Sequence, residues 1–255
     1  MRRTLVIAAN VFREVIRDRV LYLIILFALL MVAAVRLLPE LAATTEDKII
    51  RDVGLAGMTV LGLVVAIFVG TGLVNKEIEK RTVLVMLAKP ISRVEFIVGK
   101  HLGLSMVLAV LVAAMTAIYM AILSVNRIAY PVTAILVSAV FLWLLLSLMT
   151  AVAIAFGVFT SSLLATLLTF TVFLMGSASA NLVALGAQSK NPTVEAITRN
   201  LYLVLPDLSR LDLKNQAVYG LLPNPEILLQ NALYAVLYIV LLLAIATLIF
   251  SRRQF

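Results

Sequence analysis

Hydrophobic residues form six long runs along the chain, separated by shorter polar stretches. A helix needs about 20 apolar residues to cross the hydrocarbon core of a bilayer. Six segments reach or approach that length, and we take them as predicted spans: 20–36, 53–74, 98–123, 130–159, 163–185 and 227–250. Only Thr160-Ser161-Ser162 separates the fourth span from the fifth. The pattern predicts an all-α polytopic membrane protein with six transmembrane helices.

The composition excludes a soluble fold. The chain is 63% hydrophobic and 13% charged, whereas soluble domains carry about 25% charged residues. No charged residue occurs from Ile128 to Ser189. An uncharged run of this length is not expected in a soluble protein, because the surface helices of a soluble protein need a polar face toward water. We therefore expect a single transmembrane domain over residues 1–255.

The distribution of Lys and Arg predicts the orientation. One side of the membrane collects 13 of the 21 basic residues, contributed by the N-terminus, the stretch between spans two and three, and the C-terminus. Basic residues concentrate in cytoplasmic loops. Both termini should therefore be cytosolic. The positive-inside bias also explains the net charge of +8, so we expect the lipid bilayer, and no nucleic acid, as a partner. We expect a multi-pass protein of the cell membrane.

Residues 1–19 show a helical pattern with one apolar and one basic face. Leu5, Phe12 and Val15 fall on the apolar face, while Arg13 and Arg17 fall on the other. Such a helix lies in the membrane interface and does not span it. It is either an anchor or a lever joined to the first span.

The segment 186–226 is too apolar for a free loop. Two Asn-Pro pairs, Asn191-Pro192 and Asn224-Pro225, have the order of a helix cap followed by a first helical residue. The second pair would open the last span. We expect short extracytoplasmic cap helices here, tucked against or partly back into the bilayer.

The most charged stretch, Asn75 to Lys100, lies between spans two and three and contains nine charged residues. The second span can continue as a helix to Ala88, because Glu77 and Arg81 form a favourable i,i+4 pair. Such an extension would reach about 20 Å into the cytosol. The stretch therefore suits docking on a soluble partner, although a solvated positively charged loop is the alternative.

Local signals divide this stretch into two helices. Pro90 ends the first helix and favours extended backbone at Lys89. Ser92 and Glu95 have the spacing of a capping box that begins a second helix, which enters the third span. The pattern predicts a helical hairpin over 75–97.

Small residues recur along two spans at i,i+4 spacing. Ser105, Ala109, Ala113, Ala117 and Ala121 form one row, and Ser147, Ala151 and Ala155 form another. Gly99 and Gly103 form a GxxxG pair. Small residues let helices approach closely in lipid. The rows serve either packing within the chain or a seam between two subunits.

Several kinds of chemistry are absent from the sequence. It contains no cysteine and one histidine, His101, which we expect in the membrane interface, so neither a typical zinc site nor HExxH is present. No GxxxxGK[ST] phosphate loop occurs. No acidic residue lies within the predicted spans, where proton-coupled carriers keep one. If the protein carries out active transport, the energy must come from another subunit.

The hairpin and layout resemble the membrane subunit of type-2 ABC exporters. The family shows an acidic residue, a basic-Thr pair, a Leu, a Pro-x-Ser-Arg turn and a Gly-Lys pair entering the third span. The matching positions are Glu77, Arg81-Thr82, Leu87, Pro90, Ser92-Arg93 and Gly99-Lys100. The likeness in layout covers the whole chain and points to a stand-alone bacterial permease in the inner membrane.

The resemblance implies partners that composition does not show. Two membrane subunits, identical or paralogous, would pair with two soluble P-loop ATPase subunits. ATP and magnesium would bind those ATPases, so this chain would hold no cofactor and would not itself be an enzyme. The implied ATPase-coupling residues are Glu77, Glu79, Arg81, Thr82, Leu87, Pro90, Ser92 and Arg93. Thr160, Ser161 and Ser162 would form a secondary cytosolic contact.

The translocation path implied by the resemblance runs between the two membrane subunits. Its candidate lining or gate residues are Thr166, Thr169, Ser177 and Asn181, on or near the fifth span. Hydroxyl and aliphatic side chains suit a lipidic, amphipathic or hydrophobic cargo. Two other functions share much of this pattern: a membrane anchor in a non-transporting ABC-type complex, and an ATP-independent channel or carrier.

Overall fold

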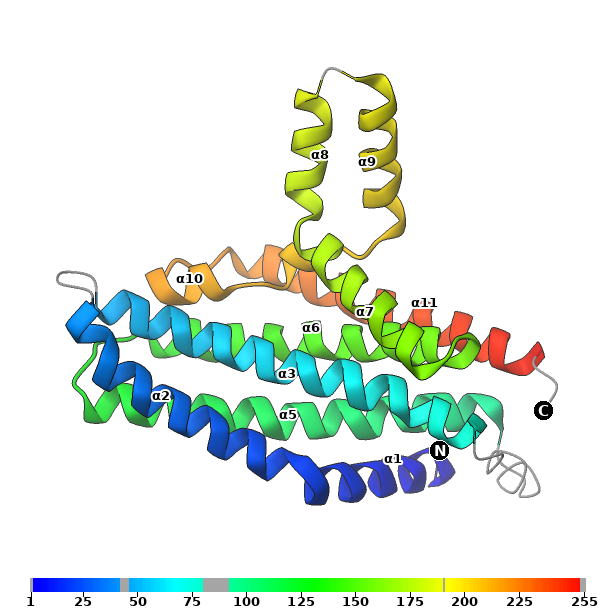
Figure 1. Ribbon diagram of the computed structural model, residues 1–255, viewed down its shortest axis with the longest axis horizontal. Helices are drawn as coiled ribbons and strands as arrows, with labels where there is room; N and C mark the ends of the chain where they lie inside the picture. The colour runs from blue at the N-terminus through cyan, green and yellow to red at the C-terminus, as the bar shows by residue number, and fades with distance from the viewer. Residues whose placement is uncertain (1, 42–45, 80–91, 190, 253–255) are drawn as a thin grey trace.

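The computed structural model describes residues 2–41, 46–79, 92–189 and 191–252, and helices dominate these ranges (Figure 1). Five helices are long and apolar enough to cross a membrane. They are α2 (Leu21–Leu41), α3 (Glu46–Glu79), α5 (Arg93–Val125), α6 (Val132–Phe159) and α11 (Pro225–Arg252). The protein is thus an all-helical, multi-pass membrane protein with five such helices among the described residues, one fewer than the six predicted spans.

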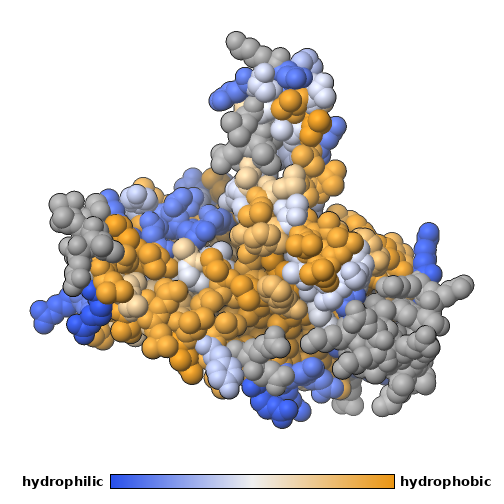
Figure 2. All heavy atoms as spheres, viewed as in Figure 1, coloured by the Kyte–Doolittle hydropathy of each residue, from blue (hydrophilic) through white to orange (hydrophobic). Residues whose placement is uncertain are grey.

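Helix α6 occupies the centre of the bundle. It packs against α3, α5 and α11, and also against the shorter α7 (Ser162–Ser177) and α10 (Lys214–Tyr219). Its residues from Leu144 to Ala155 are all buried. By contrast, α2 and α11 expose many leucines, as expected for helices that face lipid rather than water. Figure 2 shows the hydrophobic residues that cover most of the bundle's visible face.

The predicted fifth span, 163–185, does not form one continuous helix. Helix α7 ends at Ser177, and α8 (Ser179–Gln188) begins after a break at Ala178. At 1.5 Å per residue, the 16 residues of α7 extend about 24 Å, less than the hydrocarbon thickness of about 30 Å. The expectation of one continuous helix over 163–185 is therefore wrong, although its predicted beginning after Thr160-Ser161-Ser162 agrees with α7.

Long-range contacts explain this break. The carboxylate of Asp207 accepts a hydrogen bond from Ser179 Oγ at 2.8 Å, just past the end of α7. A Cβ on Gly176 would lie 2.6 Å from the carbonyl oxygen of Pro206. Burial alone raises the pKa of Asp207, but hydrogen bonds from Ser209, Ser179 and Arg210 outweigh it and lower that pKa overall. The chain turns at this carboxylate.

The segment after α7 differs in part from the expected cap. Helices α8 and α9 (Pro192–Val204) form a hairpin that stands away from the bundle at a steep angle (Figure 1). Asn191 caps α9 by accepting from Thr193 N at 3.0 Å, which confirms the predicted cap. No residue of α9 is buried. The end of α9 contacts the bundle through Val204 O, which accepts a hydrogen bond from Tyr238 Oη of α11 at 2.8 Å. The later part, the short turn η2 (Leu208–Arg210) and α10, packs against the bundle.

The N-terminal helix, α1 (Arg2–Val15), packs lengthwise against the first part of α5. It continues through a π-helical turn, η1 (Ile16–Val20), into α2. A Cβ on Gly99 would lie 2.9 Å from Ile7 Cβ, and one on Gly103 would lie 2.7 Å from Ala8 O. The lack of side chains at Gly99 and Gly103 thus lets α1 pack closely against α5. Ala8, Val11 and Val15 are buried in this packing, whereas Leu5 of the predicted apolar face is exposed. The position of α1 in the membrane interface stays a prediction.

The two rows of small residues have different environments. Ser105 and Ser147 meet between α5 and α6, with 2.6 Å between their hydroxyl oxygens. His101 is buried beside them, with Nε2 3.0 Å from Ser147 O, while its position at the level of the membrane interface stays a prediction. Ala151 on α6 is also buried, whereas Ala113 on α5 is exposed. The α6 row is packing within the chain, and the α5 row turns outward along its length.

Candidate coupling site

The site lies where α3 ends and α5 begins, around the predicted hairpin. Ser92 Oγ accepts from Glu95 N at 3.1 Å, and Ser92 N donates to Glu95 Oε2 at 3.0 Å. Both bonds of the predicted capping box are therefore confirmed. They fix the first turn of α5.

Arg93 joins this first turn to the end of α11. Its Nη1 donates to Phe250 O at 3.1 Å and also to Ser251 O. The last carbonyl groups of a helix lack partners within the helix and carry partial negative charge. The guanidinium satisfies two of these groups and places a positive charge against the helix dipole. Arg93 thus acts as a C-terminal cap for a helix that lies 157 residues away along the chain.

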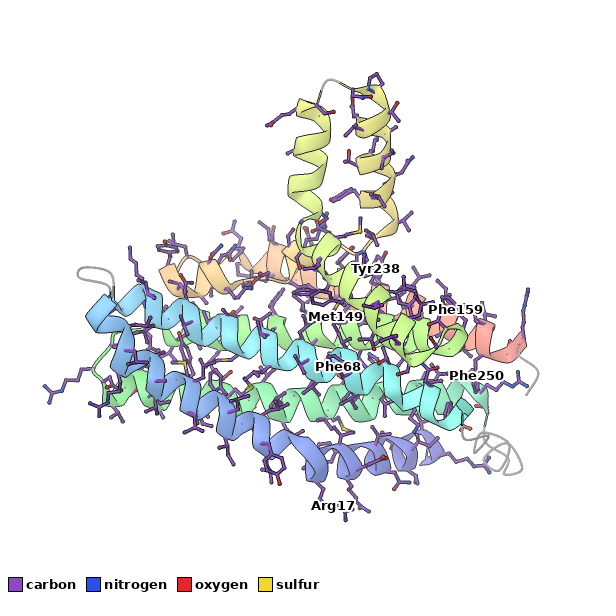
Figure 3. The ribbon with its side chains drawn as sticks, viewed as in Figure 1. Arg17, Phe68, Met149, Phe159, Tyr238 and Phe250 are labelled. Carbon is purple, nitrogen blue, oxygen red and sulfur yellow. The ribbon has the colours of Figure 1, made fainter. Side chains whose placement is uncertain are left out.

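Aromatic packing supports the same junction. The rings of Phe96 and Phe250 stack with centroids 5.6 Å apart and planes 14° apart. Lys100 Nζ lies 5.5 Å from the centroid of the Phe96 ring, within reach of a cation–π interaction. Phe250 is labelled near the end of α11 in Figure 3. These contacts make the start of α5 and the end of α11 a single packed unit.

Asn75 joins the other end of the hairpin to the turn between α6 and α7. Its side chain is buried, and the surrounding hydrogen-bond partners fix its amide orientation. In that orientation Nδ2 donates to Gly157 O at 2.8 Å and to Thr160 O at 2.9 Å, while Oδ1 accepts from Ser162 N at 3.3 Å. One amide therefore satisfies the end of α6 and the first turn of α7.

A second contact lies one turn deeper in the bundle. Thr71 Oγ1 and Thr166 Oγ1 are 3.1 Å apart, and each is also bonded to a carbonyl of its own helix. A Cβ on Gly157 would lie 3.3 Å from Thr71 O, so α6 and α3 approach closely here. Asn75 and Thr71 thus hold the last turns of α3 against both α6 and α7.

The structure describes only some of the predicted coupling residues. Glu77 and Glu79 belong to the last turns of α3. Ser92 and Arg93 lie at the start of α5, where they cap two different helices. The remaining predicted residues, Arg81, Thr82, Leu87 and Pro90, lie outside the described residues. The described part of the site is thus the pair of anchors on either side of the hairpin.

The predicted secondary contact, Thr160-Ser161-Ser162, forms the turn between α6 and α7. Asn75 bonds to it directly, which brings this turn and the base of the hairpin together. Sequence reasoning did not single out Asn75 or Phe250. The available signal for Asn75 was its place as the first strongly polar side chain after an apolar span.

The candidate path residues do not gather in one place. Thr169 is fully buried and bonds to Ala165 O at 2.7 Å. Thr166 faces Thr71 on α3. Ser177 is exposed at the end of α7, and Asn181 belongs to α8. Their role in a path stays a prediction.

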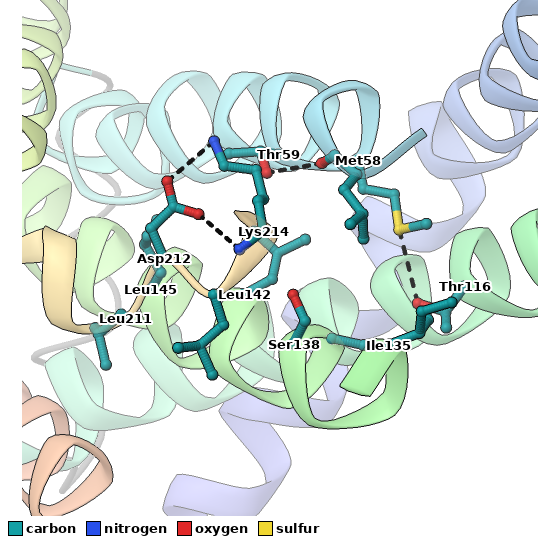
Figure 4. A pocket seen from close by; sticks show the side chains of 13 residues that line it. Met58, Thr59, Thr116, Ile135, Ser138, Leu142, Leu145, Leu211, Asp212 and Lys214 are labelled. Atoms are coloured by element: carbon teal, nitrogen blue, oxygen red, sulfur yellow. Dashed lines mark hydrogen bonds and ion pairs between the residues drawn. The ribbon is translucent and has the colours of Figure 1, made fainter. Parts of the chain in front are cut away.

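A small pocket with several polar residues lies between α3, α5, α6 and the residues 211–214 that lead into α10 (Figure 4). Asp212 and Lys214 form an ion pair of 3.0 Å at its rim. Inside, Thr59 Oγ1 donates to Leu55 O at 2.9 Å and Thr116 Oγ1 donates to Met58 Sδ at 3.7 Å. These four polar side chains each have a partner within the protein, so the pocket is a weak candidate for a binding site. Within the described ranges, no three His, Asp or Glu side chains gather as metal ligands.

Comparison with known proteins identifies the family. The family model described as ABC-2 family transporter protein matches residues 5–255. No curated protein matches the chain in sequence. The match covers the helices that carry both anchors and both ends of the predicted hairpin. The chain therefore belongs to the ABC-2 family of transporter proteins, as a multi-pass membrane component that is not itself catalytic.

Proposed function

We propose that the protein is the permease subunit of an ABC exporter, coupled through residues 75–97 to a separate soluble ATPase. The family match supports a transporter membrane component. The observation that carries the coupling proposal is the pair of anchors beside the hairpin. Asn75 joins one end of the hairpin to the α6–α7 turn, and Arg93 joins the other end to α11.

The anchors suggest how movement of the hairpin reaches the spans. An ATPase that displaces the hairpin would pull the end of α3 and the start of α5 together. Because Asn75 is buried and bonded three times, α7 follows α3 rather than separating from it. Because Arg93 and Phe96 hold the end of α11, that helix follows α5. ATP-driven closure would thereby tilt α7 and α11 as well as the helices of the hairpin itself.

The face formed by α3 and α7 is the best candidate for one wall of the path. Phe68 on α3 and Leu167 and Phe170 on α7 are exposed, and Phe68 lies near the middle of the view in Figure 3. Two such faces from two subunits would enclose a largely aliphatic and aromatic passage. That lining favours a lipidic, amphipathic or hydrophobic cargo.

The proposed assembly contains two permease subunits, identical or paralogous, and two P-loop ATPase subunits that bind ATP and magnesium. The proposed location is the bacterial inner membrane with both termini in the cytosol. The basic residues at the hairpin, the N-terminus and the C-terminus support this orientation through the positive-inside bias.

Charge reversal in the hairpin tests the proposal. The chain is co-expressed with a candidate soluble P-loop ATPase, and a complex is expected to co-purify. Glu77→Lys and Arg81→Glu should each abolish the coupling of ATP hydrolysis to transport in vesicles while leaving the helical content unchanged. Glu195→Lys on the projecting α9 is the matched control and should couple normally. Normal coupling in both hairpin variants would reject the proposal.

A vesicle assay also separates this function from the alternatives. A non-transporting complex would hydrolyse ATP without moving any cargo. A channel or carrier would move cargo in vesicles that lack the ATPase. An exporter requires both the ATPase and ATP for cargo movement.

A further inference from the structure

An open apolar groove runs along the outer surface of the bundle between α5 and α6. It has a volume of about 580 Å³. Its lining is aliphatic apart from one threonine and one tryptophan, and it consists of Ala109, Val112, Ala113, Thr116, Ala117, Met120, Leu136, Ala139, Val140 and Trp143. The exposed half of the α5 small-residue row forms part of this lining. Alanines there leave room that larger side chains would fill.

The two polar groups of the groove already have partners within the protein. Trp143 Nε1 donates to Ser105 O at 2.9 Å, and Thr116 Oγ1 donates to Met58 Sδ at 3.7 Å. The groove therefore offers no hydrogen-bonding group that a polar ligand would need. The lining of the groove therefore favours a hydrocarbon chain as its ligand.

The groove has the length and depth of one membrane leaflet. From Ala109 to Met120, eleven rises along α5 give about 16 Å, close to half of a hydrocarbon core of about 30 Å. Both helices are candidate spans over this length. The groove lies in the half of α5 and α6 that is remote from the hairpin, and it ends toward the loop that joins the two helices.

That loop places a positive charge beyond the end of the groove. Arg127 is exposed and has a φ of 59°, which turns it out of the α5 helix. The hydroxyl groups of Ser124, in the last turn of α5, and Tyr130, in the loop, are 2.7 Å apart and exposed. An arginine and a tyrosine at a span end are typical of the level of lipid headgroups. The groove and the loop together match the hydrocarbon and the phosphate of one lipid.

We propose that this groove binds one acyl chain of an anionic phospholipid, whose phosphate lies beside Arg127. The acyl chain runs from the α5–α6 loop toward Trp143, along the exposed alanines of α5. The proposal concerns a face of α5 and α6 that is separate from the coupling site and from the α3–α7 face. It does not depend on transport activity.

Tryptophan fluorescence tests the proposal, because Trp143 is the one tryptophan of the chain. The full-length protein is reconstituted in nanodiscs of zwitterionic lipid that contain a small fraction of phosphatidylglycerol with brominated acyl chains. Bromine quenches tryptophan on contact. Quenching should exceed severalfold that produced by the same fraction of brominated phosphatidylcholine.

Two variants locate the lipid. Ala113→Phe fills the groove and should reduce the quenching by phosphatidylglycerol to the phosphatidylcholine level. Leu237→Phe, at an exposed position of α11, is its control and should leave quenching unchanged. Arg127→Asn removes the charge with a residue that tolerates positive φ and should abolish the preference for phosphatidylglycerol. Arg36→Gln, at an exposed position of α2, should not.

Three results would overturn the proposal. They are equal quenching by the two brominated lipids, quenching by phosphatidylglycerol that Ala113→Phe leaves unchanged, and absence of quenching together with a change in oligomeric state for Ala113→Phe. The last result would mean that a second copy of the chain covers the groove.

Discussion

Asn75, near the end of α3, donates a hydrogen bond of 2.9 Å to the carbonyl oxygen of Thr160, in the turn between α6 and α7. The same side chain also bonds to Gly157 O and Ser162 N. A buried amide with three partners fixes three helix ends relative to one another. This relationship links the base of the predicted hairpin to a helix that faces the proposed path.

Removal of the Asn75 amide should loosen this link. Asn75→Leu leaves the carbonyl groups of Gly157 and Thr160 without their side-chain donor, at a cost of about 1–3 kcal/mol each when the groups stay buried. We expect a lower melting temperature and a lower ratio of transport to ATP hydrolysis. Thr150→Val is the control, because buried Thr150 bonds only to Leu146 O of its own helix at 2.9 Å. Equal ratios in the two variants would count against the link.

Arg93 should stabilise the last turn of α11 through its positive charge. Loss of the charge in Arg93→Gln removes a favourable interaction with the helix dipole, worth about 0.3–1 kcal/mol and weakened by salt. Hydrogen exchange in the last turn of α11 should accelerate, and the difference from wild type should shrink at high ionic strength. Arg199→Gln on α9, where no residue is buried, is expected to leave that exchange unchanged.

Acidification should weaken the junction between α7 and α8. The pKa of Asp207 lies below its ordinary value because hydrogen bonds from Ser209, Ser179 and Arg210 outweigh the effect of burial. Its stabilising contribution is therefore present above the unfolded-state pKa of about 3.9 and is lost as pH falls through the lower folded-state pKa. Thermal melting of wild type and Asp207→Asn should differ at pH 7 and converge in this acidic range. A constant difference would contradict the assignment.

The close contact of α1 with α5 should be sensitive to one methyl group. A Cβ on Gly103 would lie 2.7 Å from both Ala8 O and Val11 Cβ, so Gly103→Ala forces α1 to move. Overpacking of this kind costs about 1–3 kcal/mol. Gly57→Ala is the matched control, because its Cβ would meet Phe27 at an ordinary 3.5 Å. The melting temperature should fall in Gly103→Ala and stay close to the wild-type value in Gly57→Ala, and equal melting temperatures for the two variants would contradict this account.

Local signals in the sequence were sufficient for the helix starts. The Ser92–Glu95 box and the Asn191 cap depend on side chains within three residues of the groups they bond. The apolar runs likewise predicted most of the spans, because hydropathy and length are properties of one segment. The family pattern placed the hairpin between the second and third spans.

Long-range contacts were beyond the reach of such signals. The break at Ala178 depends on Asp207, and the partner of Arg93 is the end of α11. Nothing near Asn75 in the sequence shows that the α6–α7 turn lies beside it. The buried position of His101 depends in the same way on Ser147 of another helix. Contacts between segments that lie far apart in the sequence could be identified only from the three-dimensional structure.

The central claim is that Asn75 and Arg93 transmit the movement of the hairpin to α7 and α11. Spin labels at Leu174→Cys on α7 and Leu237→Cys on α11, both exposed positions, report this movement by pulsed electron paramagnetic resonance. Measured in the complex with its ATPase, the distance between the labels should change when ATP is added. With Asn75→Leu and Arg93→Gln present together, the ATPase should still bind, but the distance should stay at its nucleotide-free value. The same ATP-dependent change with both anchors removed would contradict the claim.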